Sequence, residues 1–142
     1  MIRERQKFPR ILLVEDRMED SKLFKIVMKE VASSAEVLTF INGAELLRFL
    51  QEALYDDSLI QVIFIDINLP GRSGLDYLSE IKNHSTWKRI PVIIFSSSAA
   101  PADISRAYLS YANSYVEKPL EVDAFRQLLK IIGDYWLHAV TF

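Results

Sequence analysis

The amino-acid sequence predicts an α/β fold in which a five-stranded parallel sheet is covered by helices on both faces. Short, continuous apolar runs alternate along the chain with segments whose apolar residues recur at helical spacing. Parallel strands need crossover connections, which helices supply. The 142 residues suffice for one compact domain with its own core. We therefore expect a single doubly wound domain.

The expected strands are short and aliphatic, as strands covered on both faces should be. In chain order they are RILLVE at 10–15, AEVLTF at 35–40, QVIFID at 61–66, PVIIFS at 91–96 and SYVE at 114–117.

Each strand is followed by a segment with one apolar face, which predicts an amphipathic helix. Asp20 and Ser21 are available as caps for the first helix, and Asn42 for the second. The five helices are expected over 19–32, from Asn42 through Leu54, around 75–82, after Pro101, and from about Glu121.

Composition excludes several classes of function. Seventeen basic and nineteen acidic side chains leave a formal charge of −2, so no overall positive field favours nucleic acid or an anionic membrane. Cysteine is absent, which excludes disulfides, thiolate metal sites and a cysteine nucleophile. No signal peptide or membrane-spanning run is present, and we expect a cytoplasmic protein without membrane insertion.

Polar residues stand where four of the strands end. Glu15 and Asp16 end the first strand, Asp66 the third, Ser96 the fourth and Lys118 the fifth. In a doubly wound sheet these carboxyl ends share one edge, where ligands bind. Three clustered carboxylates favour a cation, and their oxygen atoms suit Mg²⁺. A carboxylate could attack phosphorus at such an edge, with the metal and Lys118 neutralising charge and the Ser96 hydroxyl donating a hydrogen bond.

Four motifs in order, LLVEDRMED, FIDINLPGRSGLDYL, IPVIIFSSSA and SYVEKPL, resemble the response-regulator receiver domain of two-component signalling. The resemblance covers essentially the whole chain. It implies the flavodoxin-like (βα)5 receiver fold with strand order 2-1-3-4-5, an order for which a chemotaxis member of this family serves as a standard example.

The resemblance also implies roles for individual residues. Asp66 would be the phosphoacceptor. Glu15, Asp16 and Asp66 would serve Mg²⁺ together with the backbone carbonyl of Asn68. Ser96 and Lys118 would bind the phosphoryl group, and Ser96 would act with Tyr115 as the switch pair. Such a protein is a signalling phosphoacceptor rather than a conventional enzyme, although self-catalysed phosphotransfer and autodephosphorylation are expected.

Other interpretations of the same residues can be compared with this one. Asp66 could cap a turn, as Asp often does before Pro and Gly. A haloacid dehalogenase-type phosphatase needs a second Asp two residues after the nucleophile, where Asn68 stands. A flavodoxin-like cofactor site needs a phosphate loop after the first strand, but EDRMED repels phosphate. The alternative function is a receiver-like adaptor that signals without phosphorylation.

The carboxyl-terminal segment carries more apolar residues than the last helix of a minimal receiver requires. We expect one receiver domain over 1–142, with a core at about 9–132, an aromatic extension at 133–142 and no fused effector domain. The extension is similar to that of the single-domain regulators paired with bacterial and cyanobacterial phytochromes. This implies a homodimer through the last helix and tail, and a sensor histidine kinase partner of which the phytochrome type is one candidate. The alternative is that the tail packs on its own domain; the tail candidates are Tyr135, Trp136, Val140 and Phe142.

Overall fold

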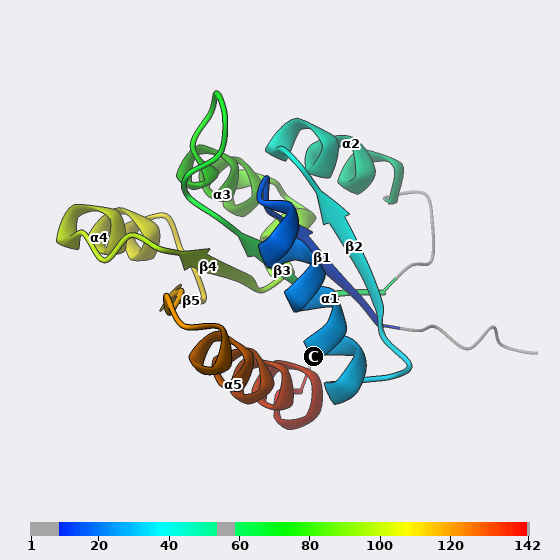
Figure 1. Cartoon of the computed structure of the whole chain (residues 1–142). Coiled ribbons are helices and arrows are strands. Elements are labelled where there is room, and N and C mark those ends of the chain that lie inside the picture. The colour runs from blue at the N-terminus through cyan, green and yellow to red at the C-terminus, as the bar shows by residue number, and fades with distance from the viewer. Residues whose placement is uncertain (1–8, 54–58, 142) are drawn as a thin grey trace, which may run out of the picture.

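A computed structural model describes residues 9–53 and 59–141 as a central parallel sheet between two layers of helices (Figure 1). The strands are β1 (Pro9–Val14), β2 (Glu36–Phe40), β3 (Leu59–Ile65), β4 (Val92–Ser96) and β5 (Ser114–Glu117). The α-helices are α1 (Met18–Val31), α2 (Gly43–Ala53), α3 (Gly74–Asn83), α4 (Pro101–Leu109) and α5 (Val122–Asp134). A short 3-10 helix, η1 (Trp87–Arg89), precedes β4, and a π-helical turn, η2 (Tyr135–Ala139), follows α5.

The sheet has the strand order β2-β1-β3-β4-β5, and every neighbouring pair is parallel. This confirms the predicted doubly wound fold. The strand order reverses between β1 and β3, so the carboxyl ends of these two central strands border the crevice in which ligands of such folds bind.

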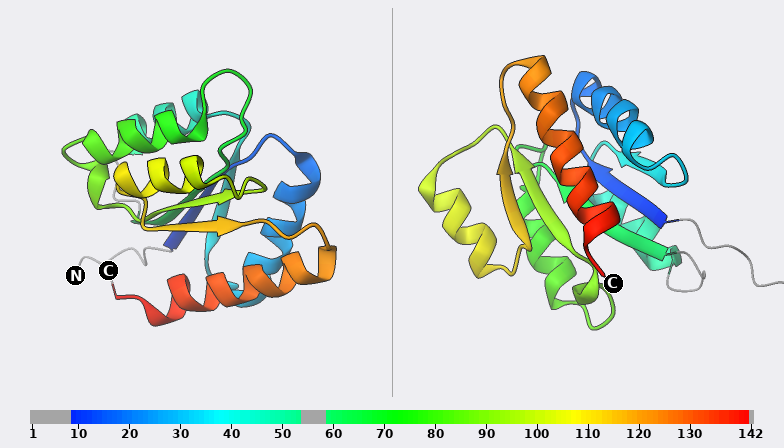
Figure 2. Two further views of the ribbon diagram at one scale, coloured as in Figure 1. Left: turned by 90° about the vertical axis from the view of Figure 1, so that its left-hand side faces the viewer. Right: turned by 90° about the horizontal axis from the view of Figure 1, so that it is seen from below.

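Alternation along the strands builds two separate cores. Leu12 and Val14 of β1 face one side of the sheet, and Ile11 and Leu13 face the other. The first side is covered by α2, α3 and α4 and the second by α1 and α5, as Figure 2 shows. Because both faces are covered, the central strands β1, β3 and β4 are mostly apolar, with Arg10, Gln61 and Ser96 as the exceptions.

The predicted elements are present, with differences of a few residues at their ends. The Asn42 side chain caps the start of α2 by accepting a hydrogen bond from the Glu45 amide at 2.9 Å, as predicted. The predicted capping of α1 by Asp20 or Ser21 is wrong, because α1 begins at Met18 and both residues lie inside it. Leu54, which was expected on the apolar face of α2, lies outside the described residues.

For three strands, the residue that directly follows the strand forms a backbone hydrogen bond with a neighbouring strand of the sheet. The Glu15 amide donates to the Phe40 carbonyl at 2.9 Å, the Asp66 amide to the Val14 carbonyl at 3.1 Å and the Lys118 amide to the Ser96 carbonyl at 2.8 Å. The parallel ladder therefore continues one residue past the strands and fixes the backbone from which Glu15, Asp66 and Lys118 project.

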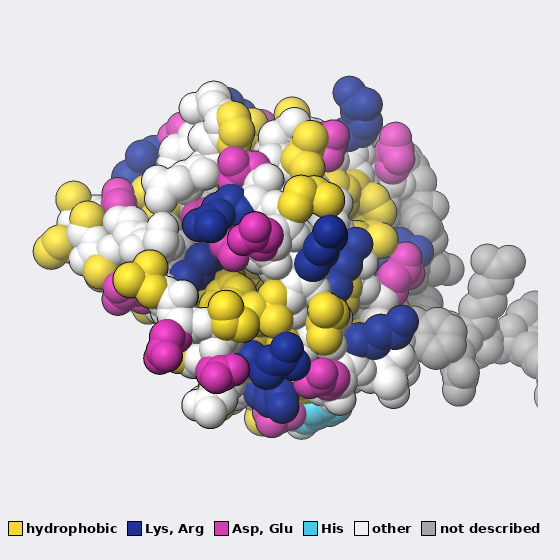
Figure 3. All heavy atoms as spheres, in the orientation of Figure 1, with side chains coloured by type: hydrophobic (Ala, Val, Ile, Leu, Met, Phe, Trp, Pro, Cys, Tyr) yellow, Lys and Arg dark blue, Asp and Glu magenta, His cyan; other side chains and the backbone are white. Residues whose placement is uncertain are grey.

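The outer surface carries charges of both signs. On the face seen in Figure 3, Lys and Arg side chains lie among Asp and Glu side chains, with apolar side chains between them. No helix within residues 9–53 and 59–141 is long and apolar enough to cross a membrane.

Candidate functional site

Three carboxylates meet at the carboxyl edge of the sheet. Glu15 and Asp16 follow β1, Asp66 follows β3, and one oxygen of each lies within 4.8 Å of the others. Glu15 and Asp66 are buried, whereas Asp16 is exposed. A set of clustered oxygen ligands with one side open to water fits a hard divalent cation such as Mg²⁺, which keeps part of its water shell.

Lys118, the residue after β5, contacts this group. It is buried, and its Nζ donates hydrogen bonds to three carboxylates: Glu15 Oε2 in a close contact, Asp20 Oδ2 at 3.1 Å and Asp66 Oδ2 at 3.2 Å. The Lys118 Nζ also lies 5.6 Å from the centre of the Phe95 ring. Burial of a charged amine is favourable only when its charge is compensated, and the three carboxylates supply that compensation.

Burial and charge shift the ionisation of this group. Burial raises the pKa of Glu15 to about 7, against the opposing effect of its hydrogen bond and ion pair with Lys118. Burial by itself lowers the pKa of Lys118, but its hydrogen bond with Glu15 and the charges of Glu15 and Asp66 raise that pKa above its ordinary value. Lys118 therefore stays cationic at neutral pH, and Glu15 holds its proton to a higher pH than an exposed glutamate, because burial raises its pKa.

The loop after β3 holds Asp66 in a defined position. The Asn68 amide donates to Asp66 Oδ1 at 3.2 Å, and the Gly74 amide donates to the Ile67 carbonyl at 3.0 Å. Gly74 begins α3 against the backbone of Asp66, and a Cβ placed on Gly74 would lie 2.0 Å from the Asp66 carbonyl oxygen. A glycine is needed here because the two backbone segments approach so closely.

Ser96 and Tyr115 are linked through the loop after β4. Ser96 is fully buried, and its Oγ accepts a hydrogen bond from the Ser98 amide at 3.2 Å. The Tyr115 hydroxyl donates to the Ser98 carbonyl at 2.6 Å, which turns this half-buried side chain toward the loop. Burial raises the pKa of Tyr115, against the effect of its hydrogen bond to Ser98. The predicted switch residues are thus joined by Ser98.

Two residues of the site were not predicted. Asp20 was considered only as a helix cap, yet it bonds Lys118. No role was assigned to Ser98 from the sequence, but its Oγ donates to Asp103 Oδ2 at 2.7 Å and so joins the loop to the first turn of α4. No spacing signal identified Asp20, because α1 begins at Met18 and the contact with Lys118 depends on the direction of its first turn.

The carboxyl-terminal extension packs in part on its own domain. Trp136 and Leu137 are half-buried against the core under α1 and α5, and Gln61 of β3 donates to the Trp136 carbonyl at 3.3 Å. The His138 Nε2 lies 2.8 Å from the carbonyl of Val31, the last residue of α1. Tyr135 stays exposed. Val140 is half-buried, and Phe142 lies outside the described residues.

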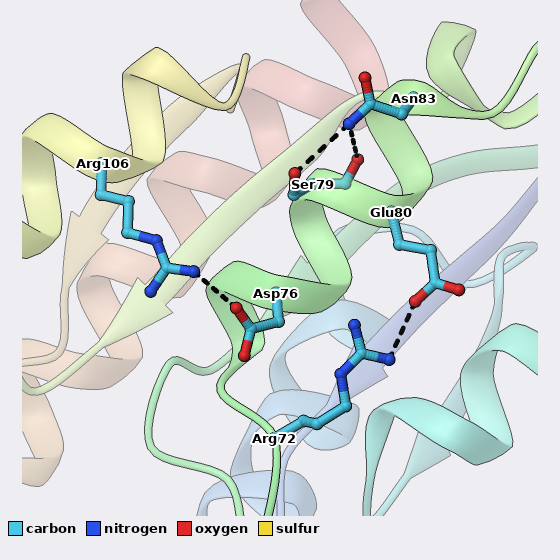
Figure 4. Close-up of a pocket in the computed structure, with 6 residues that line it drawn as sticks. All are labelled: Arg72, Asp76, Ser79, Glu80, Asn83 and Arg106. Atoms are coloured by element: carbon cyan, nitrogen blue, oxygen red, sulfur yellow. Dashed lines mark hydrogen bonds and ion pairs between the residues drawn. The ribbon is translucent and has the colours of Figure 1, made fainter.

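A separate polar hollow of about 390 Å³ lies between α3 and α4 (Figure 4). Arg72 pairs with Glu80 at 3.0 Å along one wall, and Arg106 of α4 pairs with Asp76 of α3 across it. Both cations that line the hollow are thus neutralised by an acidic neighbour, and these four side chains are 39–52% exposed, unlike the buried charged groups of the carboxylate edge.

Comparisons with known proteins agree with this geometry. Residues 11–130 match the response regulator receiver domain. The chain belongs to the response regulator receiver family. The general role of this family is to accept a phosphoryl group from a histidine kinase, and its members bind a divalent metal and act as signalling phosphoacceptors rather than as conventional enzymes.

Among relatives, the receiver is 33% identical over 133 residues to response regulator Rcp1 of Synechocystis sp. (strain ATCC 27184 / PCC 6803 / Kazusa), covering 92% of this chain and 90% of that one. It is 31% identical to the polar-differentiation response regulator DivK of Brucella anthropi over 125 residues, covering 87% and 96% of the two chains.

Two solved structures have the same fold and a similar length. The phosphorylated cyanobacterial phytochrome response regulator RcpA superposes with a TM-score of 0.87 at 33% identity, covering 93% of this chain and 96% of that one. The Mn²⁺-bound form of Rcp1 superposes with a TM-score of 0.86 at 32% identity, covering 94% and 97%. The first is a phosphorylated regulator and the second holds a divalent metal, which are the two properties that the carboxylate edge suggests.

Proposed function

We propose that Asp66 is the phosphoacceptor of this receiver and takes a phosphoryl group from a histidine kinase in a Mg²⁺-dependent reaction. The observation that carries the proposal is the group at the sheet edge: a buried Asp66 within 4.8 Å of two further carboxylates and bonded to the buried cation of Lys118. Glu15, Asp16, Asp66 and the backbone carbonyl of Asn68 would hold the ion, which neutralises charge on the transferring phosphoryl group when it is bound.

The chain's own groups carry the chemistry of transfer. A carboxylate oxygen of Asp66 attacks phosphorus, the P–N bond of phosphohistidine breaks, and the imidazole leaves with the electron pair of that bond. Lys118 compensates negative charge on the phosphoryl oxygens. Autodephosphorylation follows when water attacks the same phosphorus atom and the P–O bond to Asp66 breaks, which restores the carboxylate.

Ser96 and Tyr115 would change position when Asp66 is phosphorylated. The Ser96 Oγ accepts from the Ser98 amide, and a hydroxyl that accepts a hydrogen bond retains its hydrogen for donation. That hydrogen can bind a phosphoryl oxygen and pull the Ser98 loop toward Asp66. Because the Tyr115 hydroxyl bonds the carbonyl of the same residue, movement of the loop alters Tyr115 and the adjoining surface of α4, β5 and α5.

Further proposals concern partners and organisation. We infer a homodimer through α5 and the tail, supported by exposed Ile131 and Tyr135, which stand four residues apart on one helical face.

A phytochrome-type kinase is the proposed donor, because Rcp1 and RcpA are the relatives described above. A cytoplasmic location follows from phosphotransfer by such a kinase. We treat residues 1–142 as one receiver domain, since the tail shares the core beneath α1 and α5.

The test is the intact mass after incubation with acetyl phosphate, with and without Mg²⁺, for the wild-type protein and an Asp66→Asn variant. We expect one phosphoryl addition of about 80 Da that needs both the metal and Asp66. Addition to the Asp66→Asn variant would overturn the assignment of the acceptor. No addition to the wild-type protein from acetyl phosphate or a phosphorylated histidine kinase would favour the adaptor function instead.

A further inference from the structure

We propose that Asp20 is a positioning residue for phosphotransfer, which holds the Lys118 ammonium in place when the other carboxylates turn to the metal and the phosphoryl group. This inference rests on the proposed function of Asp66 and adds a residue to it. Asp20 lies in the first turn of α1, and its Oδ2 is 3.1 Å from Lys118 Nζ.

The hydrogen-bonding capacity of Lys118 gives the first argument. An ammonium group has three N–H donors and no acceptor. In this structure Nζ bonds three carboxylates, those of Glu15, Asp20 and Asp66. A phosphoryl oxygen can therefore bind Lys118 only by replacing one of these partners, and phosphorylation of Asp66 frees the donor that now reaches Asp66 Oδ2.

The position of the metal group gives the second argument. Glu15 and Asp66 belong to the set of carboxylates within 4.8 Å of one another, and Asp20 does not. A bound cation would draw oxygen atoms of Glu15 and Asp66 toward itself, because these oxygens would become ligands. Asp20 is the carboxylate partner of Lys118 outside that set, so it can keep its bond to Nζ throughout the reaction.

Burial gives the third argument. The Asp20 side chain is 22% exposed and the Lys118 side chain 7% exposed, so their contact is shielded from water. Charge-assisted hydrogen bonds are short and directional, and a flexible lysine stem loses rotational freedom when its end is held. Asp20 therefore fixes where the positive charge lies relative to Asp66.

The first experiment compares phosphorylation rates by acetyl phosphate for Asp20→Ala, Asp20→Asn and Glu19→Ala. Glu19 is the matched control, because it stands beside Asp20 in the first turn of α1 and is exposed. We expect Asp20→Ala to lower the rate roughly tenfold or more, since misplacing a catalytic group by about 1 Å has such effects. Asp20→Asn, whose Oδ1 still accepts a hydrogen bond, should retain more activity, and Glu19→Ala should match the wild-type protein.

A double-mutant cycle separates positioning from a general structural effect. If Asp20 acts through Lys118, then Asp20→Ala should add nothing in a Lys118→Ala background. An equal loss in both backgrounds would overturn the proposal. A loss of metal affinity that parallels the loss of rate would also overturn it, because Asp20 would then be a metal ligand. Equal phosphorylation rates for Asp20→Ala and Glu19→Ala would overturn it as well.

A second measurement does not depend on phosphotransfer. The ¹⁵N resonance of the Lys118 ammonium in metal-free protein should shift, or exchange faster with water, in Asp20→Ala but not in Glu19→Ala. An unchanged resonance in Asp20→Ala would overturn the contact itself. If the wild-type protein takes up no phosphoryl group, the function proposed for Asp66 and the positioning role of Asp20 are both contradicted. A normal wild-type reaction with unchanged Asp20→Ala kinetics removes the role of Asp20 alone.

Discussion

At the scale of single residues, the buried Glu15 carboxyl makes the stability of the metal-free protein depend on pH. Its pKa rises from 4.5 to about 7 on folding, chiefly through burial. Between these values the folded state keeps a proton that the unfolded state has released. The free energy of unfolding should therefore fall as pH rises through this window.

The check is the thermal midpoint of metal-free protein at pH of about 5.5 and about 8. We expect a lower midpoint at the higher pH and a weaker dependence in Glu15→Gln, which cannot ionise. Mg²⁺ should restore more stability at the higher pH, because metal binding requires the ionised carboxylates. The same pH dependence in Glu15→Gln would show that other groups cause it.

Gly74 makes a second prediction at this scale. An alanine Cβ there would lie 2.0 Å from the Asp66 carbonyl oxygen and 2.8 Å from the Ile65 Cγ2. Gly74→Ala should lower the free energy of unfolding by about 1–3 kcal/mol, a typical result of overpacking, and should slow phosphorylation because the backbone of Asp66 must move. Urea unfolding and the mass assay measure the two effects.

Gly133→Ala is the control for Gly74→Ala. Its Cβ would lie 3.0 Å from the Val31 Cγ1 and 3.3 Å from the Met28 Sδ, both in side chains that can shift. The better helix propensity of alanine, up to about 1 kcal/mol, offsets part of that crowding within α5. A loss of stability as large as that of Gly74→Ala would contradict the special role given to the Asp66 backbone.

The residues that could be predicted from sequence are those at strand ends. Glu15, Asp66, Ser96 and Lys118 each interrupt or follow an apolar run, so their place at the carboxyl edge follows from the alternation of strands and helices. Asp20 and Ser98 could not be predicted in this way. Their contacts depend on the direction of a helix turn and a loop, and no periodic pattern fixes either one.

At the scale of elements, α4 is attached to the rest of the fold by contacts of unequal strength. The Tyr108 hydroxyl of α4 accepts from the Tyr115 amide of the edge strand β5 at 3.1 Å, and the Tyr115 hydroxyl bonds the Ser98 carbonyl. Arg106 and Asp76 join α4 to α3, but these side chains are 52% and 39% exposed (Figure 4).

We expect the hydrogen bond from the Tyr115 hydroxyl to the Ser98 carbonyl to contribute more stability than the ion pair between Arg106 and Asp76. Tyr115→Phe removes a half-buried hydrogen bond and should lower the free energy of unfolding by about 0.5–1.5 kcal/mol. Arg106→Ala should change it by less than about 1 kcal/mol, because water and salt screen an exposed pair. Urea unfolding of both variants ranks them, and a larger loss for Arg106→Ala would reverse this account of α4.

Element types differ in how far the sequence predicts them. β5 was predicted at its observed bounds, and the other strands to within about two residues, because buried parallel strands are short apolar runs. The π-helical turn η2 gave no comparable signal. It continues the apolar pattern of α5, so the position of the tail is defined by tertiary contacts, among them those with Gln61 and Val31.

At the scale of the whole molecule, the two faces of the α5 and η2 segment differ in burial. Trp136 and Leu137 face the core within the same chain, whereas Ile131 and Tyr135 are 66% and 57% exposed. Intramolecular packing of the tail and dimerisation are therefore compatible, because they use different side chains. Exposed apolar residues on one helical face are typical of an interface between proteins.

The last prediction separates these two roles. Ile131→Asp with Tyr135→Asp should convert a dimer to a monomer, because each new carboxylate would be buried unpaired at the interface, while the thermal midpoint of the monomer changes little. Trp136→Ala should instead lower the free energy of unfolding by roughly 2–4 kcal/mol through loss of packing in the chain's own core. Sedimentation equilibrium at tens of micromolar gives the mass. A wild-type monomer at that concentration would contradict the dimer. The tail would then only pack within its own chain, where it contacts α1 and β3.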